Sequence, residues 1–431
     1  MDSRPTRIAV IETSSYGGLL HYAVQLADGL ATRGHEVDVI VPRENELIGH
    51  RGGARMRAVL TPSVRWTERP KRGRLRILFR RIGTAIRLTR SWARILTEVR
   101  RGRYDIALVN SDISLTPTAS GALALTALPG GPVVARINHN VRVFNRWGGE
   151  EMFKSPPLLE AINRRLVPRL DLVLVHGEHA RNEFSELWPN VPVAVIPHGD
   201  ERIFADDPPP PSEEQRILFF GEWRKVKGLP ALMAAFDELA MRRPDVRLTI
   251  AGKPSPADTD PESVKRWAAG HGDRVKVIDH YVPLEDVPGI FGEARVVVTP
   301  YVVGYQSGVV HLAMTMGRAV VATDVGDLSS AVIDGVTGRV VPAGDTTALS
   351  SALEEIVSDP ELAVRFGREG QRRILSSSNW ETVSAQLERA FSQVFEGVSP
   401  GKRRQKPWRR RLGVPVPQSD TRVVEDFRRA A

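Results

Sequence analysis

Residues 217–228 read ILFFGEWRKVKG, a short apolar run that meets a glycine and then three cations. An apolar run of this length bounded by turn signals is typical of a buried strand. A helix-length amphipathic segment follows it, and the same alternation recurs through most of the chain. Strands that alternate with helices form parallel sheets, so this stretch predicts an α/β fold.

Two series of such strands can be traced along the chain. The strands expected in the first half are 8–11, 37–41, 106–109, 133–137, 172–175 and 193–196. After a polar, proline-rich linker, 206–214, a second series comprises 217–220, 247–251, 275–278, 296–299, 319–322 and 338–341. Two sets of six strands predict two Rossmann-like, doubly wound domains that face a central cleft. Ligands of such folds bind beyond the carboxyl ends of the strands, so the cleft is the expected active site.

The chain divides accordingly into four segments. We expect residues 1–205 to form an N-terminal domain and residues 206–378 a C-terminal domain. Residues 379–397 have the apolar periodicity of an amphipathic helix, which we expect to return toward the N-terminal domain. Residues 398–431 are rich in Pro, Gly, Lys and Arg without a sustained period, which predicts a basic, mostly disordered tail.

The positive charge is concentrated in two places. The 431-residue chain has a net charge of +9. Residues 65–103 carry fourteen Lys and Arg against two Glu, and residues 402–411 add seven more, so the remainder is acidic. This distribution argues against a protein that binds polyanions over its whole surface and favours two local attachment surfaces. The chain has no cysteine, which excludes a disulfide framework or a cysteine-ligated metal and fits a reducing compartment.

We expect neither a targeting segment nor a membrane span. Residues 1–7 are polar and lead straight into the first apolar run, which is unlike a signal peptide. Residues 113–135 are uncharged, but they contain three prolines and several Ser and Thr. We therefore interpret them as a buried helix and a strand.

Three strand-end motifs are candidates for anion binding. Gly17 and Gly18 stand between the first strand and the next helix, where backbone amides and the helix dipole favour a phosphate. Arg224 and Lys227 can neutralise a diphosphate, including the charge left on a departing nucleotide. The Gln-Ser-Gly turn at 306–308 opens a helix whose free amides form a second anion site.

The ordered combination of these motifs resembles a GT-B glycosyltransferase, and more narrowly the retaining, family 4-type bacterial enzymes. The resemblance covers roughly residues 7–397 and is strongest at 216–345. It rests on the two glycines at 17–18, RGHEV at 33–37, PHG at 197–199, FFGEWRKVKG at 219–228, QSG at 306–308, GRAVVATDVG at 317–326 and DGVTG at 334–338. It implies that the N-terminal domain receives the acceptor and that the C-terminal domain binds a nucleotide sugar.

The resemblance also assigns individual residues. Those expected to hold the donor diphosphate are Gly17, Gly18, Arg224, Lys227, Gln306, Ser307 and Gly308. His139 stands where the family often has a histidine near the transferred sugar, which makes it the candidate catalytic residue. A lone histidine at a strand end is otherwise more often structural, and that interpretation stays open.

The chain departs from the family pattern near the donor. Many relatives carry two glutamates eight positions apart, beside the donor sugar and the ribose, where this chain has Gly304 and Leu312. We place Val309 in the same vicinity. Arg295 and Ser330 stand where the family usually has acidic residues.

Residues 75–99 have apolar side chains in steps of three and four, which predicts an amphipathic helix with an arginine-rich polar face. Such a helix either packs on its own domain or lies on anionic lipid, where each basic residue contributes about 1 kcal/mol. We favour the membrane. The residues expected to touch it are Arg74, Arg76, Phe79, Arg80, Arg81, Arg87 and Trp92. Nucleic acid is the alternative ligand, but no nucleic-acid fold motif accompanies the helix.

The sequence thus predicts a glycosyltransferase that passes a sugar, with retention, from a nucleoside-diphosphate sugar to a hydroxyl of a lipid-linked or polysaccharide acceptor. We expect it on the cytoplasmic face of the cell membrane, in cell-wall or exopolysaccharide synthesis, with an anionic membrane surface and no nucleic acid as partner. The Asp-Thr-Asp motif at 258–260 has the spacing of a metal site but lies in a proline-rich loop, which we interpret as a surface loop. The resemblance implies that no metal is needed, and we expect no other cofactor. A nucleotide-sugar epimerase, a non-catalytic homologue and a nucleic-acid-binding protein remain as alternatives.

Overall fold

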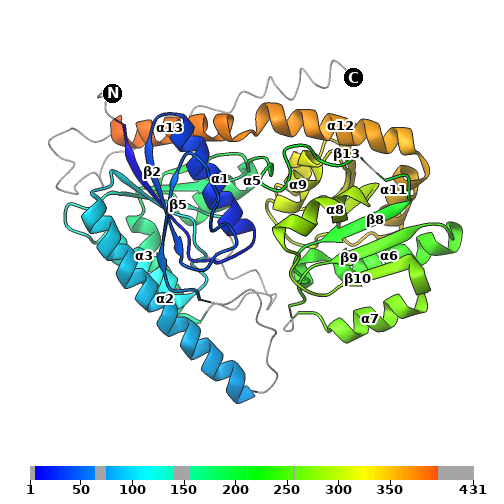
Figure 1. Ribbon diagram of the computed structural model, residues 1–431, viewed down its shortest axis with the longest axis horizontal. Coiled ribbons are helices and arrows are strands. Elements are labelled where there is room, and N and C mark those ends of the chain that lie inside the picture. Colours follow the sequence, from blue (N-terminus) through cyan, green and yellow to red (C-terminus); the bar gives the residue numbers. More distant parts are fainter. Residues whose placement is uncertain (1–4, 64–73, 140–155, 211, 256–257, 397–431) are drawn as a thin grey trace.

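The computed structural model describes residues 5–63, 74–139, 156–210, 212–255 and 258–396, and of 74–78 the backbone alone. The side chains of Arg74 and Arg76 and the tail 398–431 therefore lie outside the described residues. Two sheets lie side by side in Figure 1, the N-terminal one on the left, and two long C-terminal helices run along the top of both.

The N-terminal sheet has seven strands in the order β3-β2-β1-β4-β5-β6-β7, and its paired strands are parallel. These strands are β1 (Arg7–Ile11), β2 (Glu36–Pro42), β3 (Arg55–Leu60), β4 (Ile106–Val109), β5 (Val133–Ile137), β6 (Leu172–Val175) and β7 (Val193–Val195). The order reverses beside β1, the switch point at which doubly wound sheets bind ligands. We call the part of the chain built on this sheet the N-terminal domain.

The C-terminal sheet has six parallel strands in the order β10-β9-β8-β11-β12-β13. Its strands are β8 (Arg216–Phe220), β9 (Arg247–Ala251), β10 (Val275–Ile278), β11 (Val296–Thr299), β12 (Ala319–Thr323) and β13 (Gly338–Val341). Its switch point lies beside β8, the strand from which the sequence analysis started. The part built on this sheet is the C-terminal domain.

Helices cover both faces of each sheet. In the N-terminal domain they are α1 (Gly18–Thr32), α2 (Arg74–Gly102), α3 (Thr116–Thr126), α4 (Pro157–Leu166) and α5 (Glu178–Leu187). In the C-terminal domain they are α6 (Leu229–Arg242), α7 (Pro261–Gly270), α8 (Val287–Gly292), α9 (Gly308–Thr315), α10 (Leu328–Ala331), α11 (Thr346–Ser358) and α12 (Pro360–Ser377). The stretch 113–135 forms α3 and β5, as predicted. Among the described residues no helix is both long and apolar enough to cross a membrane.

The prediction of six strands in the first half was wrong by one, because it missed β3. The sequence of β3 is RMRAVL, whose alternating arginines hide the apolar run that marks the other strands. As the edge strand it pairs with β2 alone, and most of its residues are only partly buried. Arg55 binds both carboxylate oxygens of Asp38 on β2, at 2.7 and 2.8 Å, so an ion pair adds to the backbone pairing of this strand.

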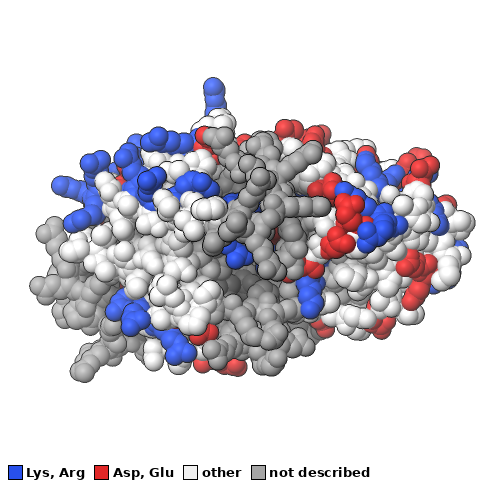
Figure 2. Space-filling model, turned by 90° about the horizontal axis from the view of Figure 1, so that it is seen from below, with Lys and Arg blue, Asp and Glu red and all other residues white. Residues whose placement is uncertain are grey.

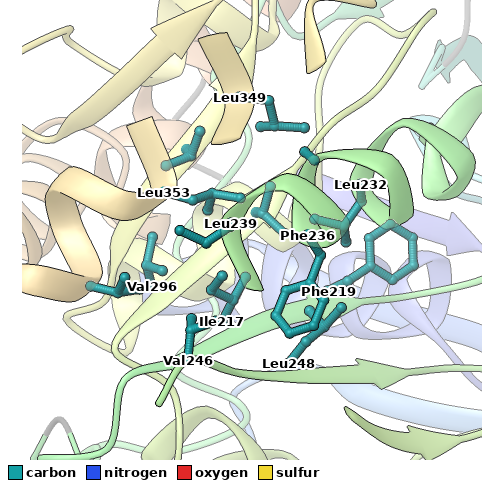
Figure 3. Close-up of a cluster of buried hydrophobic side chains, with 14 of the residues drawn as sticks. Ile217, Phe219, Leu232, Phe236, Leu239, Val246, Leu248, Val296, Leu349 and Leu353 are labelled. Atoms are coloured by element: carbon teal, nitrogen blue, oxygen red, sulfur yellow. The ribbon is translucent and has the colours of Figure 1, made fainter. Parts of the chain in front are cut away.

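The core of the C-terminal domain shows why the alternating pattern folds this way. Figure 3 shows apolar side chains of α6 and α11 packed on one face of the sheet. The labelled residues come from β8, β9, β11 and these two helices: Ile217, Phe219, Leu248, Val296, Leu232, Phe236, Leu239, Leu349 and Leu353, with Val246 before β9. A strand buried on both faces has to be apolar throughout, which explains the continuous apolar runs.

Helix α13 (Trp380–Glu396) crosses back to the N-terminal domain, as predicted for the C-terminal helix. Its apolar face belongs to the same buried cluster as α1, through Trp380, Val383, Leu387, Ala390 and Phe391. The Trp380 indole donates to the Asp200 carbonyl at 2.8 Å, in the segment that connects the domains. The final helix therefore ties the two domains together.

We predict that Gly228→Ala destabilises the C-terminal domain by about 2 kcal/mol or more. Gly228 begins α6 with a φ of 69°, and a Cβ there would lie 1.7 Å from the Pro300 carbonyl oxygen. Gly270→Ala is the control, because its added methyl meets no atom within 4 Å. Thermal unfolding of both variants tests this prediction, and equal melting temperatures would contradict it.

Candidate active site

Arg224 and Lys227 lie in the turn after β8, where one turn of 3-10 helix forms over Lys225–Lys227. The Val302 amide bonds to the backbone of this turn at 3.0 Å, and Lys227 Nζ lies 3.7 Å from the centroid of the Tyr301 ring. The basic turn is thus held against the loop that follows β11. That loop leads into α9, so the two predicted anion sites of the C-terminal domain are neighbours.

The carboxylates of the Asp-Thr-Asp motif have protein partners. Asp258 accepts from Ser255 Oγ at 2.9 Å, and Arg224 Nε lies 3.9 Å from the same carboxylate. Asp260 accepts from the Glu262 amide at 3.2 Å and caps α7. These contacts account for the motif as a surface loop, and they leave the Arg224 side chain 47% exposed.

The turn before α9 faces the N-terminal domain. Ser307 is 3% exposed, and its hydroxyl is 2.8 Å from the Tyr301 hydroxyl. The Gln306 amide nitrogen donates to the His176 carbonyl at 3.4 Å, and Gln306 Oε1 lies 3.3 Å from His311 Nε2. The Gln306 side chain is thus directed at histidines, while α9 begins without a side-chain cap.

The N-terminus of α1 already has a carboxylate against it. Gly17, with a φ of 85°, donates its amide to Glu46, which also bonds to His21 Nε2 at 2.6 Å. The second Glu46 oxygen accepts from the hydroxyl of Tyr281 in the C-terminal domain, at 2.6 Å. Of the two glycines predicted to hold the diphosphate, Gly17 therefore has its amide bonded to Glu46. A Cβ on either glycine would meet no atom within 4 Å.

The same network sets the charge of Glu46. Burial alone raises the pKa of a carboxyl group, but the hydrogen bonds from His21, Tyr281 and the Gly17 amide favour the ionised form. The pKa of Glu46 is consequently below its ordinary value. An ionised carboxylate at a helix N-terminus is stabilised by the helix dipole. Glu46 therefore holds the glycine loop through the Gly17 amide and, at the same time, contacts the other domain through Tyr281.

Three histidines surround the buried Tyr22 ring, and a fourth contacts one of them from the other domain. The rings of His139, His176 and His198 have centroids 5.0, 5.3 and 5.1 Å from that of Tyr22. The His311 ring, from α9 of the other domain, is 4.7 Å from His198. The sequence interpretation considered His139 alone and missed the cluster.

Burial keeps this cluster neutral. It lowers the pKa of His176 to about 3 and that of His198 to about 4, and it holds His139 and His311 below the ordinary histidine value. Burial also raises the pKa of Glu201 to about 8. At neutral pH the group therefore contains uncharged imidazoles beside a protonated carboxyl group.

Glu201 connects three parts of the molecule. Gln25 of α1 donates to its carboxyl group at 3.1 Å, and its amide donates to Thr315 Oγ1 at the end of α9, also at 3.1 Å. Its Oε1 lies 3.9 Å from His198 Nδ1. The segment after β7 thereby makes polar contacts with both domains.

A second contact between the domains caps α5. Asp327, after β12, accepts from the amides of His179 and Ala180 at 2.9 Å each. A Cβ on Gly177 would lie 2.1 Å from the Asp327 carboxylate carbon, so a residue without a side chain is needed there. Tyr305 also donates to Glu183 of α5, at 2.5 Å. The loops that follow β11 and β12 thus dock on the N-terminal domain.

The comparisons with known proteins agree with this architecture. Residues 16–199 match the family described as Glycosyltransferase Family 4, and residues 214–359 match Glycosyl transferases group 1. The chain is 27% identical to the phosphatidyl-myo-inositol mannosyltransferase of Mycolicibacterium smegmatis, over 88% of this chain and 90% of that protein. A GDP-mannose-dependent phosphatidylinositol monomannoside mannosyltransferase of that organism is 28% identical, over 63% of this chain and 75% of that protein.

Solved structures share the fold. Sucrose-phosphate synthase from Thermosynechococcus elongatus superposes with a TM-score of 0.67 at 20% identity, covering 91% of this chain and 99% of that one. HepE from Anabaena, in complex with UDP, gives a TM-score of 0.63 at 17% identity, covering 90% of this chain and 100% of that one. The chain is a GT-B glycosyltransferase of the family 4 type.

The structure corrects the glycosyltransferase's predicted membrane contacts at one residue. Trp92 is 2% exposed and packs in the core of the N-terminal domain, where a Cβ on Gly121 of α3 would lie 2.1 Å from its ring. The amphipathic period could not separate this buried part of α2 from an exposed one. Arg87 is partly buried and donates to the Ser63 carbonyl at 3.1 and 2.9 Å. Phe79, by contrast, is 70% exposed.

The positions of the family's paired glutamates are filled differently in this enzyme. Leu312 is 3% exposed and packs in the core under α9, so it presents no polar group to a donor. The backbone at Gly304 packs closely against Gly326, where an added Cβ would lie 2.1 Å from the Gly304 carbonyl oxygen. Val309 faces Gly221, with its Cγ2 3.7 Å from a Cβ built there. A backbone contact and apolar packing replace both carboxylates.

The sequence did hold a signal for the missed cluster. Asn110, His139, His176 and His198 each follow one of four successive strands, β4 to β7, by one to three residues. The carboxyl ends of parallel strands share one edge, so polar residues in these positions converge. The signal was missed because each histidine was weighed by itself.

We predict that Glu201→Gln makes the stability of the enzyme less dependent on pH above about 6.5. The folded pKa of Glu201, about 8, exceeds the ordinary value of 4.5, so its protonated form favours folding and this stability is lost as pH rises toward 8. The buried histidines act below pH ~6.5, where the unfolded chain takes up protons.

Urea unfolding of wild type and variant at pH about 6.5 and about 8 measures the effect. The wild type should lose about 2 kcal/mol more unfolding free energy than the variant over this interval. Parallel pH profiles for the two proteins would show that Glu201 is already ionised at neutral pH.

Proposed function

We propose that the enzyme transfers a sugar from a nucleoside-diphosphate sugar to a hydroxyl group of a lipid-linked or polysaccharide acceptor, with retention, at the cytoplasmic surface of the membrane. The observation that carries this proposal is the pairing of the Arg224–Lys227 turn with the N-terminus of α9 across the Tyr301 contact. A helix N-terminus beside two cations suits a diphosphate.

The chemistry follows from these groups. The bond from the sugar carbon to the diphosphate oxygen breaks as the acceptor oxygen bonds to that carbon. Negative charge develops on the leaving diphosphate, which can take up the proton that the acceptor hydroxyl loses. Arg224 offers a planar fork and Lys227 a point charge, while the amides at Ser307 and Gly308 complete the cradle. All of this charge comes from the protein, so the proposed reaction needs no metal ion.

The relatives support a lipid acceptor. Two of them are named for transfer of mannose to phosphatidylinositol or its mannoside. The N-terminal end of α2 projects from the N-terminal domain in Figure 1, on the side expected to receive the acceptor. We therefore place the lipid-linked acceptor against this domain.

The first turns of α2 have the chemistry of a lipid-binding surface. Phe79, Ile82 and Ile86 are 70%, 47% and 47% exposed and follow one another at helical spacing. Arg80 and Arg81 beside them are exposed. Lys and Arg gather on the N-terminal half of the face in Figure 2, whereas acidic and basic residues mix on the other half. An apolar stripe flanked by arginines is typical of an interfacial helix.

We predict that Arg224→Ala and Lys227→Ala each weaken binding of a nucleoside diphosphate about tenfold or more, because each removes a charged partner of the phosphates. Lys225→Ala is the matched control, because Lys225 lies in the same turn. The affinity of this variant for the nucleoside diphosphate should change by less than about threefold. A thermal-shift screen of nucleotide sugars identifies the base, and calorimetry with the matching nucleoside diphosphate gives the affinities.

Product analysis then tests transfer itself. With labelled donor and a lipid extract, transfer puts the label on an acceptor, whereas an epimerase leaves an isomerised free donor. If no nucleotide sugar or nucleoside diphosphate bound to the protein, the proposed donor site would be refuted.

We predict that the triple substitution Phe79→Ser, Ile82→Ser and Ile86→Ser abolishes flotation with vesicles that contain phosphatidylglycerol. These three side chains supply the apolar part of the contact, and the arginines alone bind weakly once salt screens them. Met241→Ser is the control, since Met241 is 80% exposed but lies on α6 of the other domain. Absence of wild-type flotation at low salt would exclude the membrane contact.

A further inference from the structure

A chain of buried polar contacts runs along the carboxyl ends of β1 and β4 to β7. Glu12 Oε2 accepts from the Asn110 amide at 2.6 Å, and Asn110 Oδ1 lies 2.9 Å from His139 Nε2. His139 Nδ1 lies 3.0 Å from His176 Nε2, and His176 Nδ1 lies 3.1 Å from the Ile196 carbonyl. The predicted catalytic histidine therefore has both ring nitrogens within hydrogen-bonding distance of protein atoms.

The partners of this chain determine where its protons must be. The Asn110 nitrogen donates to the Leu19 carbonyl, at 2.8 Å, as well as to Glu12, so the Asn110 oxygen is the atom that faces His139. His139 Nε2 must therefore carry a proton. Carbonyl oxygens only accept, so His176 Nδ1 must carry one also.

The contacts in this chain need one more proton than the two neutral imidazoles carry. Three contacts, from Asn110 to His139, from His139 to His176 and from His176 to the Ile196 carbonyl, each need one N–H. Two neutral imidazoles have only two protons between them. A third proton would satisfy every contact and give the pair a single positive charge.

The cationic groups around the pair oppose its protonation. Burial and the neighbouring imidazoles hold the pKa of His139 and of His176 down, and the Arg136 charge adds to this at His139. The Arg373 charge lowers the pKa of His311 in the same way. The carboxyl groups that face the cluster are Glu12 through Asn110 and Glu201 beside His198, and the buried hydroxyl is that of Tyr22. At neutral pH the pair is therefore uncharged, and it takes up a proton only if negative charge is brought next to it.

The proposed diphosphate site adjoins the histidine cluster to which this pair belongs. Gln306 donates to the His176 carbonyl and faces His311 Nε2, which joins the α9 turn to the cluster. A Cβ on Gly308 would lie 3.5 Å from His198 Nε2. A diphosphate held by the amides of this turn brings negative charge next to imidazoles from which it also excludes water, and it therefore favours their protonated form.

We propose that binding of the nucleotide sugar is coupled to the uptake of one proton by the His139–His176 pair. Glu12, Asn110 and His176 are then positioning residues, which fix the His139 ring and complete the third hydrogen bond when the proton arrives. The resulting charge lies beside the departing diphosphate, where a fixed positive charge lowers the barrier to leaving. This inference rests on the proposed donor site.

Calorimetry of nucleotide-sugar binding at pH about 7 tests the coupling. UDP-glucose, GDP-mannose and ADP-glucose are suitable probes, because their phosphates do not titrate near neutrality. The binding enthalpy is measured for the full chain in buffers of different ionisation enthalpy, and its slope against that enthalpy counts protons. We expect a slope of about one proton taken up, with the dissociation constant rising about tenfold per pH unit above neutrality.

Four variants assign the proton. His176→Asn and His139→Asn each remove one imidazole and should bring the slope close to zero, and either one suffices if the other fails to fold. His50→Asn, at a surface pair with Asp28, should leave the slope unchanged. Glu201→Gln removes the other group of the cluster that titrates near neutrality, and its slope should remain at about one proton.

The outcomes are distinct from those for the donor site. A nucleotide sugar that binds the wild type with a slope near zero overturns the coupling and leaves the donor site intact. A slope that persists in both histidine variants, or that only Glu201→Gln removes, also overturns it. If none of the three probes binds, the proposed donor site fails first.

Discussion

The positive ends of three helices, α1, α5 and α9, meet in the cleft, and the arrangement of the two domains depends on how these ends are neutralised. Glu46 binds at α1 and reaches Tyr281 of the other domain, while Asp327 crosses the interface to cap α5. Helix α9 begins without a side-chain cap. Two helix ends therefore join the domains, and the third is the one that an anionic ligand can complete.

The sequence predicted the sheets well because parallel strands are buried on both faces. All twelve predicted strands match within a residue at each end, and seven of them, β4, β5, β6, β9, β10, β11 and β13, coincide with their predicted bounds. Strand β3 escaped because an edge strand need not be apolar: its arginines face Asp38 and Glu98. The same physics explains Trp92, since a helix period shows that one face is apolar but not whether the domain or a membrane covers it.

The site was predictable only in part. Glycines and cations at strand ends indicate anion binding residue by residue, and these motifs carried the family resemblance. The histidine chain depends on strand order, because β4, β5, β6 and β7 are adjacent in the sheet only once the fold is known. Glu46 and Asp327 depend further on how two separate domains meet, and the residues they contact lie far away in sequence.

The contacts between the domains are weak enough for the free energy of ligand binding to compensate for their loss. Separating the domains would break the bonds from Tyr281 to Glu46, from the α5 amides to Asp327 and from Tyr305 to Glu183. Each bond to a charged group has a net value of about 1.5–3 kcal/mol, and water replaces it when the surface opens. Micromolar binding supplies about 8 kcal/mol, which is comparable to their sum. A donor bound as proposed would thus have enough free energy to set how far the domains close, with α13 connecting them.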